Sequence, residues 1–155
     1  MLNPLLFSKA GEMPSTVRVL GFDYGQKRIG VAIGQSVTQT ASPLTTLPAT
    51  NGIPDWQTLQ EIIDKWKPDF CIVGIPYNPE GSQSTQQNAQ RFANQLHEHT
   101  QLPVLRIDEH LSTVSAKERL RAQNKIPNKT NVNAMAAAII LESWFQDKDE
   151  KKDPF

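Results

Sequence analysis

The sequence has a single cysteine, no long apolar segment and no excess of charge, and each of these features excludes a class of protein. One cysteine, Cys71, excludes an internal disulfide and fits a protein of the reducing cytoplasm. No apolar run approaches the roughly 20 residues that a membrane span needs, so we expect neither a secretion signal nor a membrane partner. The 16 basic and 16 acidic residues cancel, and any affinity for nucleic acid must come from a local basic patch.

Length and composition indicate one domain. A chain of 155 residues is long enough for a single layered core and too short for two. Its 38% hydrophobic and 21% charged residues are typical of a globular protein. We expect a loose leader over 1–16, the domain over 17–146 and a frayed charged tail over 147–155.

Short apolar runs alternate with segments of helical periodicity along the chain. Strands are expected at 17–23 and 28–34, within 38–47 up to Pro48, and at 70–75 and 103–107. Four helices are expected. The first runs from Pro54 to 66, and the second follows a loop over 76–84. The third runs from a cap at Ser112 or Thr113 to about 123, and the last covers 132–145. The first two strands form an antiparallel hairpin, and the later alternation of helix and strand adds parallel strands. The sequence therefore predicts an α/β fold, a mixed β-sheet with helices on both faces.

Asp23 is the residue that first suggests a site. It ends the first apolar run and is soon followed by Lys27 and Arg28. A carboxylate in such a strand is costly to bury as an anion unless a cation or several donors meet it. The position therefore indicates a metal or phosphate site, although an Asp-x-Gly segment is also common turn chemistry. Sites in parallel sheets lie beyond the carboxyl ends of strands, where Gly74 and Glu109 are also expected.

Four stretches of the chain together resemble one protein family. They are residues 21–32 (GFDYGQKRIGVA), 72–76 (IVGIP), 108–113 (DEHLST) and 132–137 (VNAMAA). In this order they resemble the YqgF/RuvX family of ribonuclease H-like nucleases, and the resemblance covers residues 17–145. It implies a ribonuclease H-like fold in which acids from the first strand, a later strand and the last helix surround divalent metal.

The resemblance also implies which residues hold the metal and the substrate. Asp23, Glu109 and Asn133 occupy the three ligand positions for Mg²⁺ or Mn²⁺ and are the candidate catalytic residues. Metal ions held by carboxylate oxygens can activate a water and stabilise the leaving oxygen of a phosphodiester. Asp108, the neighbour of Glu109 on an extended segment, is expected to point the other way. The candidate substrate contacts are Lys27, Arg28, Gly74, His110, Ser112 and Thr113.

Two positions depart from the family's pattern. An acid belongs at position 133, and Asn133 offers a cation a carbonyl oxygen without the negative charge; it also simply suits a helix N-terminus. Glu142 does not replace that acid, since nine residues place it about 180° around the helix. His110 stands where the family carries arginine, which weakens a phosphate contact unless the imidazole is protonated.

A basic run follows the Glu109 segment. It consists of Lys117, Arg119, Arg121, Lys125 and Lys129, against the single acid Glu118. Such a run is usually a solvated face, but its closeness to Glu109 equally favours a track for a nucleic-acid backbone. Arg28 likewise either pairs with an acid or holds the scissile phosphate.

The leading hypothesis is a cytoplasmic, metal-dependent nuclease acting on structured nucleic acid. Members of the resembled family are associated with maturing the 5′ end of the 16S ribosomal RNA precursor and are also described as Holliday junction resolvases. A ribosome-bound RNA and branched DNA therefore both stay open as substrates. A nuclease-derived binding module weakened by Asn133 is a third alternative. An ATP-binding protein of the actin-like fold is disfavoured, because no second Asp-x-Gly hairpin appears. The sequence does not choose between a monomer and a weak homodimer.

Overall fold

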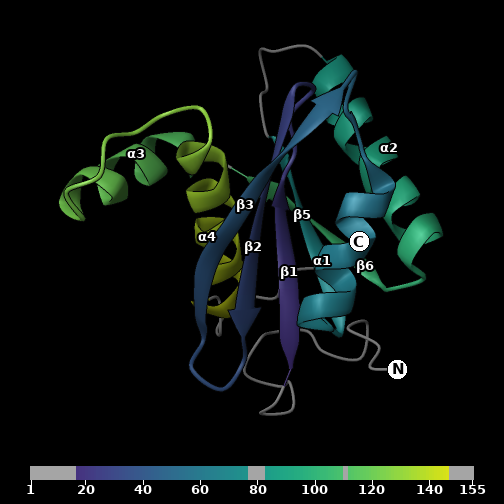
Figure 1. The fold of residues 1–155 in the computed structure, drawn as a ribbon, viewed down its shortest axis with the longest axis horizontal. Helices are drawn as coiled ribbons and strands as arrows, with labels where there is room; N and C mark the ends of the chain where they lie inside the picture. Colours follow the sequence, from purple (N-terminus) through teal and green to yellow (C-terminus); the bar gives the residue numbers. More distant parts are fainter. Residues whose placement is uncertain (1–16, 77–82, 110–111, 147–155) are drawn as a thin grey trace.

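The computed structural model describes residues 17–76, 83–109 and 112–146. Within these ranges the strands form one six-stranded sheet in the order β4-β3-β2-β1-β5-β6, with helices on both faces (Figure 1). The strands are β1 (Arg18–Asp23), β2 (Arg28–Gln35), β3 (Thr40–Thr50), β4 (Ile53–Pro54), β5 (Phe70–Pro76) and β6 (Val104–Glu109). The helices are α1 (Trp56–Trp66), α2 (Gln83–Thr100), α3 (Ser112–Ala122) and α4 (Asn131–Gln146). The predicted mixed sheet is confirmed.

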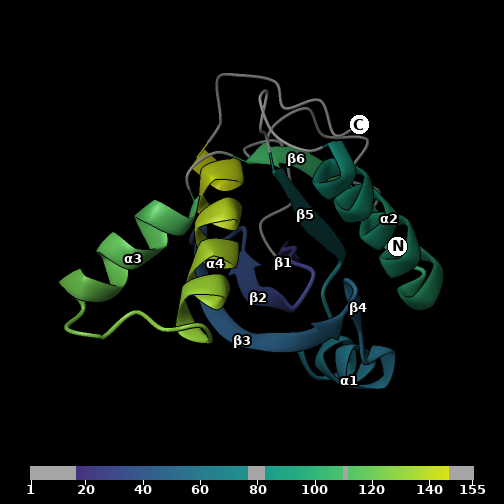
Figure 2. The same cartoon turned by 90° about the horizontal axis from the view of Figure 1, so that it is seen from above.

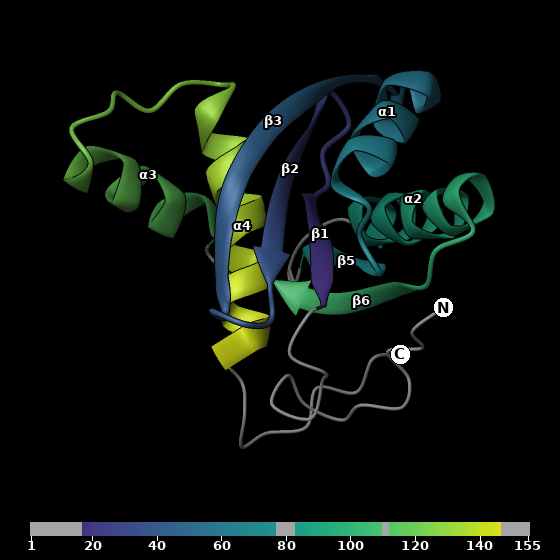
Figure 3. The ribbon, with the colours of Figure 1, turned by 60° about the horizontal axis from the view of Figure 1, so that its bottom comes forward.

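The direction of the central strands brings the predicted site residues to one edge. β1 pairs antiparallel with β2, as the short turn between them predicts, and parallel with β5 on its other side. β5 in turn pairs parallel with β6. The carboxyl ends of β1, β5 and β6 therefore lie at the same edge of the sheet. Strand β1 lies between β2 and β5 (Figure 3).

Helices α1 and α2 cover one face of the sheet, and α4 covers the other with α3 on its outer side (Figure 2). The alternation of side chains along β1 assigns its residues to the two faces. Leu20 and Phe22 pack in the core under α1 and α2, whereas Val19 packs in the core under α4. Asp23 continues the series of Val19 and Gly21, so its side chain lies on the α4 face.

Glycines bring α4 unusually close to the sheet. A Cβ atom built on Gly30 of β2 would lie 1.9 Å from the backbone oxygen of Asn133, which is closer than any real contact. On Gly74 of β5 it would lie 2.6 Å from Cδ1 of Ile140. Gly21 and Gly34 face the same helix. At Gly30 the obstacle is helix backbone, so only a residue without a side chain fits there, and the first turn of α4 is thereby fixed beside the end of β1.

The predicted end of the third strand was wrong, because β3 continues through Pro48 to Thr50. Proline lacks the N–H group of a sheet ladder and is tolerated where that group would have no partner. The neighbouring Ala49 donates its N–H to the oxygen of Lys27, on the β2 side, so the nitrogen of Pro48 faces away from β2. On that other side β4 reaches only Ala49 and Thr50.

Three helix boundaries also differ from the predictions. Pro54 does not open α1 but belongs to β4; Asp55 is the N-cap, and its carboxylate accepts the N–H of Gln57 at 3.1 Å. The expected 76–84 loop was wrong at both ends, because Pro76 belongs to β5 and α2 begins at Gln83. Ser112 and Thr113 both lie within α3, so neither is its cap.

The expected leader over 1–16 and tail over 147–155 lie outside the described residues. Among the helices that are described, none combines the length and the apolar character needed to cross a lipid bilayer.

Candidate active site

Asp23 occupies the centre of the site because it ends the central strand. Its backbone neighbours in the sheet are Gly30 on β2 and Gly74 on β5, so both flanking positions lack a side chain. Asp23 as a residue is half-buried on the α4 face, and its carboxyl group is largely removed from solvent. No other side chain of these neighbouring strands therefore fills the space directly beside it.

Glu109 reaches the same edge from β6. Leu105 and Ile107 pack under α4, and Glu109 follows them at the two-residue spacing of one strand face. It is half-buried, whereas Asp108 is exposed, and the predicted opposite orientation of the two acids is confirmed. A Cβ built on Gly74 would lie 3.5 Å from that of Glu109, so this glycine separates the two carboxylates.

The two carboxylates are electrostatically coupled. Burial first, and the negative charge of Glu109 second, raise the pKa of the Asp23 carboxyl to about 7. A bound cation would favour the ionised form and offset both causes. Carboxylate oxygens are the ligands that Mg²⁺ and Mn²⁺ prefer, so the pair fits a hard divalent cation. Within the described residues no cluster of three or more His, Cys, Asp or Glu side chains could hold a metal.

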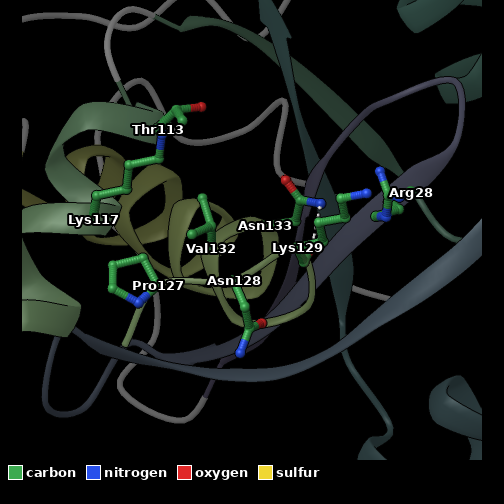
Figure 4. A pocket seen from close by; sticks show the side chains of 8 residues that line it. All are labelled: Arg28, Thr113, Lys117, Pro127, Asn128, Lys129, Val132 and Asn133. Carbon is green, nitrogen blue, oxygen red and sulfur yellow. Dashed lines mark hydrogen bonds between the residues drawn. The ribbon is translucent and has the colours of Figure 1, made fainter. Parts of the chain in front are cut away.

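Asn133 meets the site from the first turn of α4. Its backbone oxygen lies over Gly30, the sheet partner of Asp23. Its side-chain Nδ2 donates to the backbone oxygen of Lys129 at 3.1 Å, and the dashed line in Figure 4 marks this bond. The bond uses the amide's nitrogen and leaves its Oδ1 as the atom that could meet a cation. Asn133 therefore has both a structural role at the helix start and an oxygen suited to ligation.

A basic cavity of about 390 Å³ adjoins Asn133 and Arg28 (Figure 4). It lies between the start of β2, helix α3 and the segment that leads into α4. Its lining residues are Arg28, Thr113, Lys117, Pro127, Asn128, Lys129, Val132 and Asn133. Three of these side chains are cationic and none is acidic, so the cavity attracts anions. A phosphate group fits this chemistry.

Only some of the predicted substrate-contact residues lie at the cavity or between the two carboxylates. Arg28 and Thr113 line the basic cavity, and Gly74 lies between the two carboxylates. Lys27 is exposed in the turn before β2 and does not line it. The predicted contact of His110 lies outside the described residues, as does the side chain of Ser112.

The basic run contributes unequally to the site. Lys117 and Lys129 line the cavity. Arg119 instead pairs with Glu142 of α4, which accounts for both charges. The predicted position of Glu142 away from the site agrees with this pairing. Pro127 and Asn128 also line the cavity and were not predicted from the sequence, because the cavity forms only when their segment folds beside Arg28.

The fold has counterparts among solved structures. The RuvC protein of T. thermophilus, in a complex with a Holliday junction substrate, superposes with a TM-score of 0.51 and 14% identity, covering 83% of this chain and 93% of that one. Another RuvC structure from Thermus thermophilus gives a TM-score of 0.50. The domain is therefore ribonuclease H-like, with carboxylates at the ends of its parallel strands.

Sequence comparison then places the chain among particular relatives. Residues 17–147 match the family described as RuvX, Holliday junction resolvase, and the chain belongs to this family. A protein of Pectobacterium carotovorum named "Putative pre-16S rRNA nuclease" is 47% identical over 131 residues, which cover 83% of this chain and 94% of that protein. A protein of Legionella pneumophila with the same name is 47% identical over 133 residues, covering 84% and 96%.

Proposed function

We propose that this protein is a metal-dependent nuclease that hydrolyses phosphodiester bonds at the 5′ end of precursor 16S ribosomal RNA. The observation that carries the proposal is the coupled pair Asp23 and Glu109 at one sheet edge, beside a cavity with three cations and no acid. Paired carboxylates suit a divalent cation, and the cationic wall suits the phosphates around it. The names of relatives at 47% identity support the choice of precursor RNA.

Each residue of the site has a distinct part in this reaction. The carboxylates of Asp23 and Glu109 would hold Mg²⁺ or Mn²⁺, and Oδ1 of Asn133 would add a neutral oxygen. When bound, the metal would lower the pKa of an attacking water and stabilise the leaving oxygen. Arg28 and Lys129 would position the substrate phosphates. Because Asn133 carries no charge, we expect weaker metal binding and lower activity than with a third acid.

A branched DNA substrate is the second candidate. The family's description as Holliday junction resolvases favours it. The formal net charge of zero argues against strong binding of an extended duplex by the isolated domain, since affinity for DNA depends on the phosphates neutralised. A ribosome-bound RNA requires less of the domain's own affinity, and we therefore favour RNA.

Cleavage assays test the proposal directly. Labelled 5′-extended precursor RNA and a four-way DNA junction are incubated with Mg²⁺, with Mn²⁺ or with EDTA. Asp23→Asn and Glu109→Gln are expected to lose activity by roughly a thousandfold or more. The matched control is Asp108→Asn, which removes a neighbouring carboxylate on the other face and is expected to stay within about twofold.

The outcomes separate the candidate functions. Preferential cutting of the junction would replace the RNA assignment, and cutting in EDTA would overturn metal dependence. No cutting by any protein would leave a binding module weakened at position 133. In that case Asn133→Asp, which restores the third acid, is expected to create metal-dependent activity; an inactive Asn133→Asp protein would contradict a nuclease role altogether.

A further inference from the structure

The segment 123–130 between α3 and α4 presents an isoleucine to solvent. The Ile126 side chain is 84% exposed, compared with 62% for Val37 and 52% for Val114, the next most exposed large apolar residues of the described part. Burial of apolar surface is favourable, so contact with a partner would stabilise this side chain. Figure 1 shows this segment and α3 projecting away from the sheet.

The start of the segment is fixed by the way α3 ends. The N–H of Lys125 donates to the oxygen of Leu120 at 2.8 Å, and that of Asn124 donates to the oxygen of Arg121 at 3.0 Å. Asn124 has a φ of 60°, the left-handed conformation of this helix ending. The backbone immediately before Ile126 is therefore held by the helix itself.

The backbone after Ile126 is fixed by two asparagines. Nδ2 of Asn131 donates to the oxygen of Ile126 at 3.0 Å, and its Oδ1 accepts the N–H of Asn128 at 2.8 Å. Oδ1 of Asn128 accepts the N–H groups of Thr130 and Asn131, each at 2.9 Å. Pro127 restricts the backbone further. The isoleucine is thus held outward by ordered structure on both sides.

The charges around Ile126 identify the kind of partner. No acidic residue occurs between Glu118 and Glu142, and Lys125 and Lys129 flank the isoleucine. Lys129 also lines the basic cavity, so this surface is continuous with the proposed substrate site. A partner has to be anionic and yet offer an apolar face. Nucleic acid meets both requirements, since every base has an apolar face between charged phosphates.

We propose that Ile126 is an apolar wedge that inserts against a base at the end of a base-paired stem of the RNA substrate, while Lys125 and Lys129 hold the flanking phosphates. Apolar side chains inserted at a base step unstack it and fix the position of the nucleic acid. A stem end held at Ile126 would place the adjoining single strand at the basic cavity beside Asn133. This inference rests on the proposed function and specifies how the substrate is positioned.

Fluorescence of 2-aminopurine tests the wedge separately from cleavage. The probe base is placed at successive positions across the stem end of a short RNA, and binding is followed with the full chain carrying Asp23→Asn. We expect an increase at one position with this protein. Adding Ile126→Ala should abolish the increase and weaken binding roughly tenfold, with little change for an unpaired RNA of equal length. Ile126→Leu should restore the fluorescence increase and the affinity. Val37 is an exposed apolar residue elsewhere, and Val37→Ala should change neither quantity.

Each outcome bears on one proposal. If Ile126→Ala gives the same fluorescence and affinity as Val37→Ala, the wedge is refuted and an acidic protein partner becomes the alternative occupant. If the Ile126-dependent signal appears but the chain without Asp23→Asn never cleaves RNA, the wedge stands and the nuclease assignment fails. Normal cleavage by Ile126→Ala together with an unchanged signal leaves the nuclease assignment intact and overturns only the wedge.

Discussion

The two faces of the sheet differ at the edge that holds the candidate site. Under α1 and α2 the core is filled by large rings: the centroid of Phe92 lies 5.8 Å from that of Phe22 and 5.5 Å from that of Tyr24. Under α4, by contrast, glycines adjoin the two carboxylates Asp23 and Glu109. Both faces gain stability from buried apolar area, and under α4 the ring centroid of Phe70 lies 5.6 Å from that of Trp144. Only the α4 face also accepts an acid whose burial is destabilising, which indicates that the chemistry belongs to this face.

The largest effect on stability is expected from the ring-packed face. Phe92 is 1% exposed and contacts three other rings, so Phe92→Ala should lower the free energy of unfolding by about 4 kcal/mol. Because this residue lies on the face opposite Asp23, kcat should stay within about twofold at temperatures where the variant is folded. Urea denaturation and cleavage assays at low temperature measure both quantities. A large loss of kcat in the folded variant would contradict the division between the faces.

On the α4 face, where glycines of the sheet contact the helix, a substitution should lower both stability and activity. Gly30→Ala puts a methyl group where the backbone of Asn133 lies, and a helix backbone cannot move aside as a side chain can. We expect a loss of about 3 kcal/mol and, unlike for Phe92→Ala, a fall in kcat because α4 and Asn133 shift from Asp23. Comparing the two folded variants in one cleavage assay is the test. Equal kcat values would mean that the spacing of α4 does not matter to the chemistry.

The sequence predicted the strands better than the cavity. The apolar runs at 17–23 and 70–75 predicted strands, and β1 and β5 lie there with residues buried on both faces of the sheet. The short strand β4 was missed, because two residues, Ile53 and Pro54, are too few to show a period. A local sequence pattern is enough to predict an element that is long and has a buried face.

The site was only partly predictable for a different reason. Asp23 is visible from the sequence because an acid interrupts an apolar strand. The cavity, however, joins Arg28 to Lys129, which are about a hundred residues apart, and no local pattern encodes that contact. Nor does the sequence indicate that Arg119 pairs with Glu142 while Lys117 faces the cavity. Which cations of a basic run are available depends on how α3 packs on α4.

Asp23→Asn should stabilise the metal-free protein at alkaline pH. The folded pKa of about 7 exceeds the usual aspartate pKa of 3.8, so the folded state holds the extra proton and wild-type stability falls as the pH rises between these values. Above pH 7 the full penalty, roughly 4 kcal/mol, applies. Asp23→Asn lacks this penalty, so it should be more stable than the wild type at pH 8 and as stable as the wild type near pH 4. Urea titrations in EDTA at both pH values measure this.

Mg²⁺ provides the control for that comparison. It should raise the Tm of the wild type at pH 8 and leave the Tm of Asp23→Asn nearly unchanged, because a ligand stabilises only the state that binds it. A variant less stable than wild type at pH 8 would show that the Asp23 carboxylate is held by favourable contacts and is not a destabilising charge.

The smallest expected effect concerns the salt dependence of RNA binding. Lys117 and Lys129 line the cavity, whereas Lys65 lies near the ring of Trp66 on α1, at the other face. Each phosphate contact removed should reduce the slope of log K against log salt by about 0.7 for a single strand. Lys117→Ala and Lys129→Ala should therefore each lower the slope by that amount, and Lys65→Ala should not. Equal slopes for all three would place the RNA backbone outside the cavity and break the functional distinction between the faces.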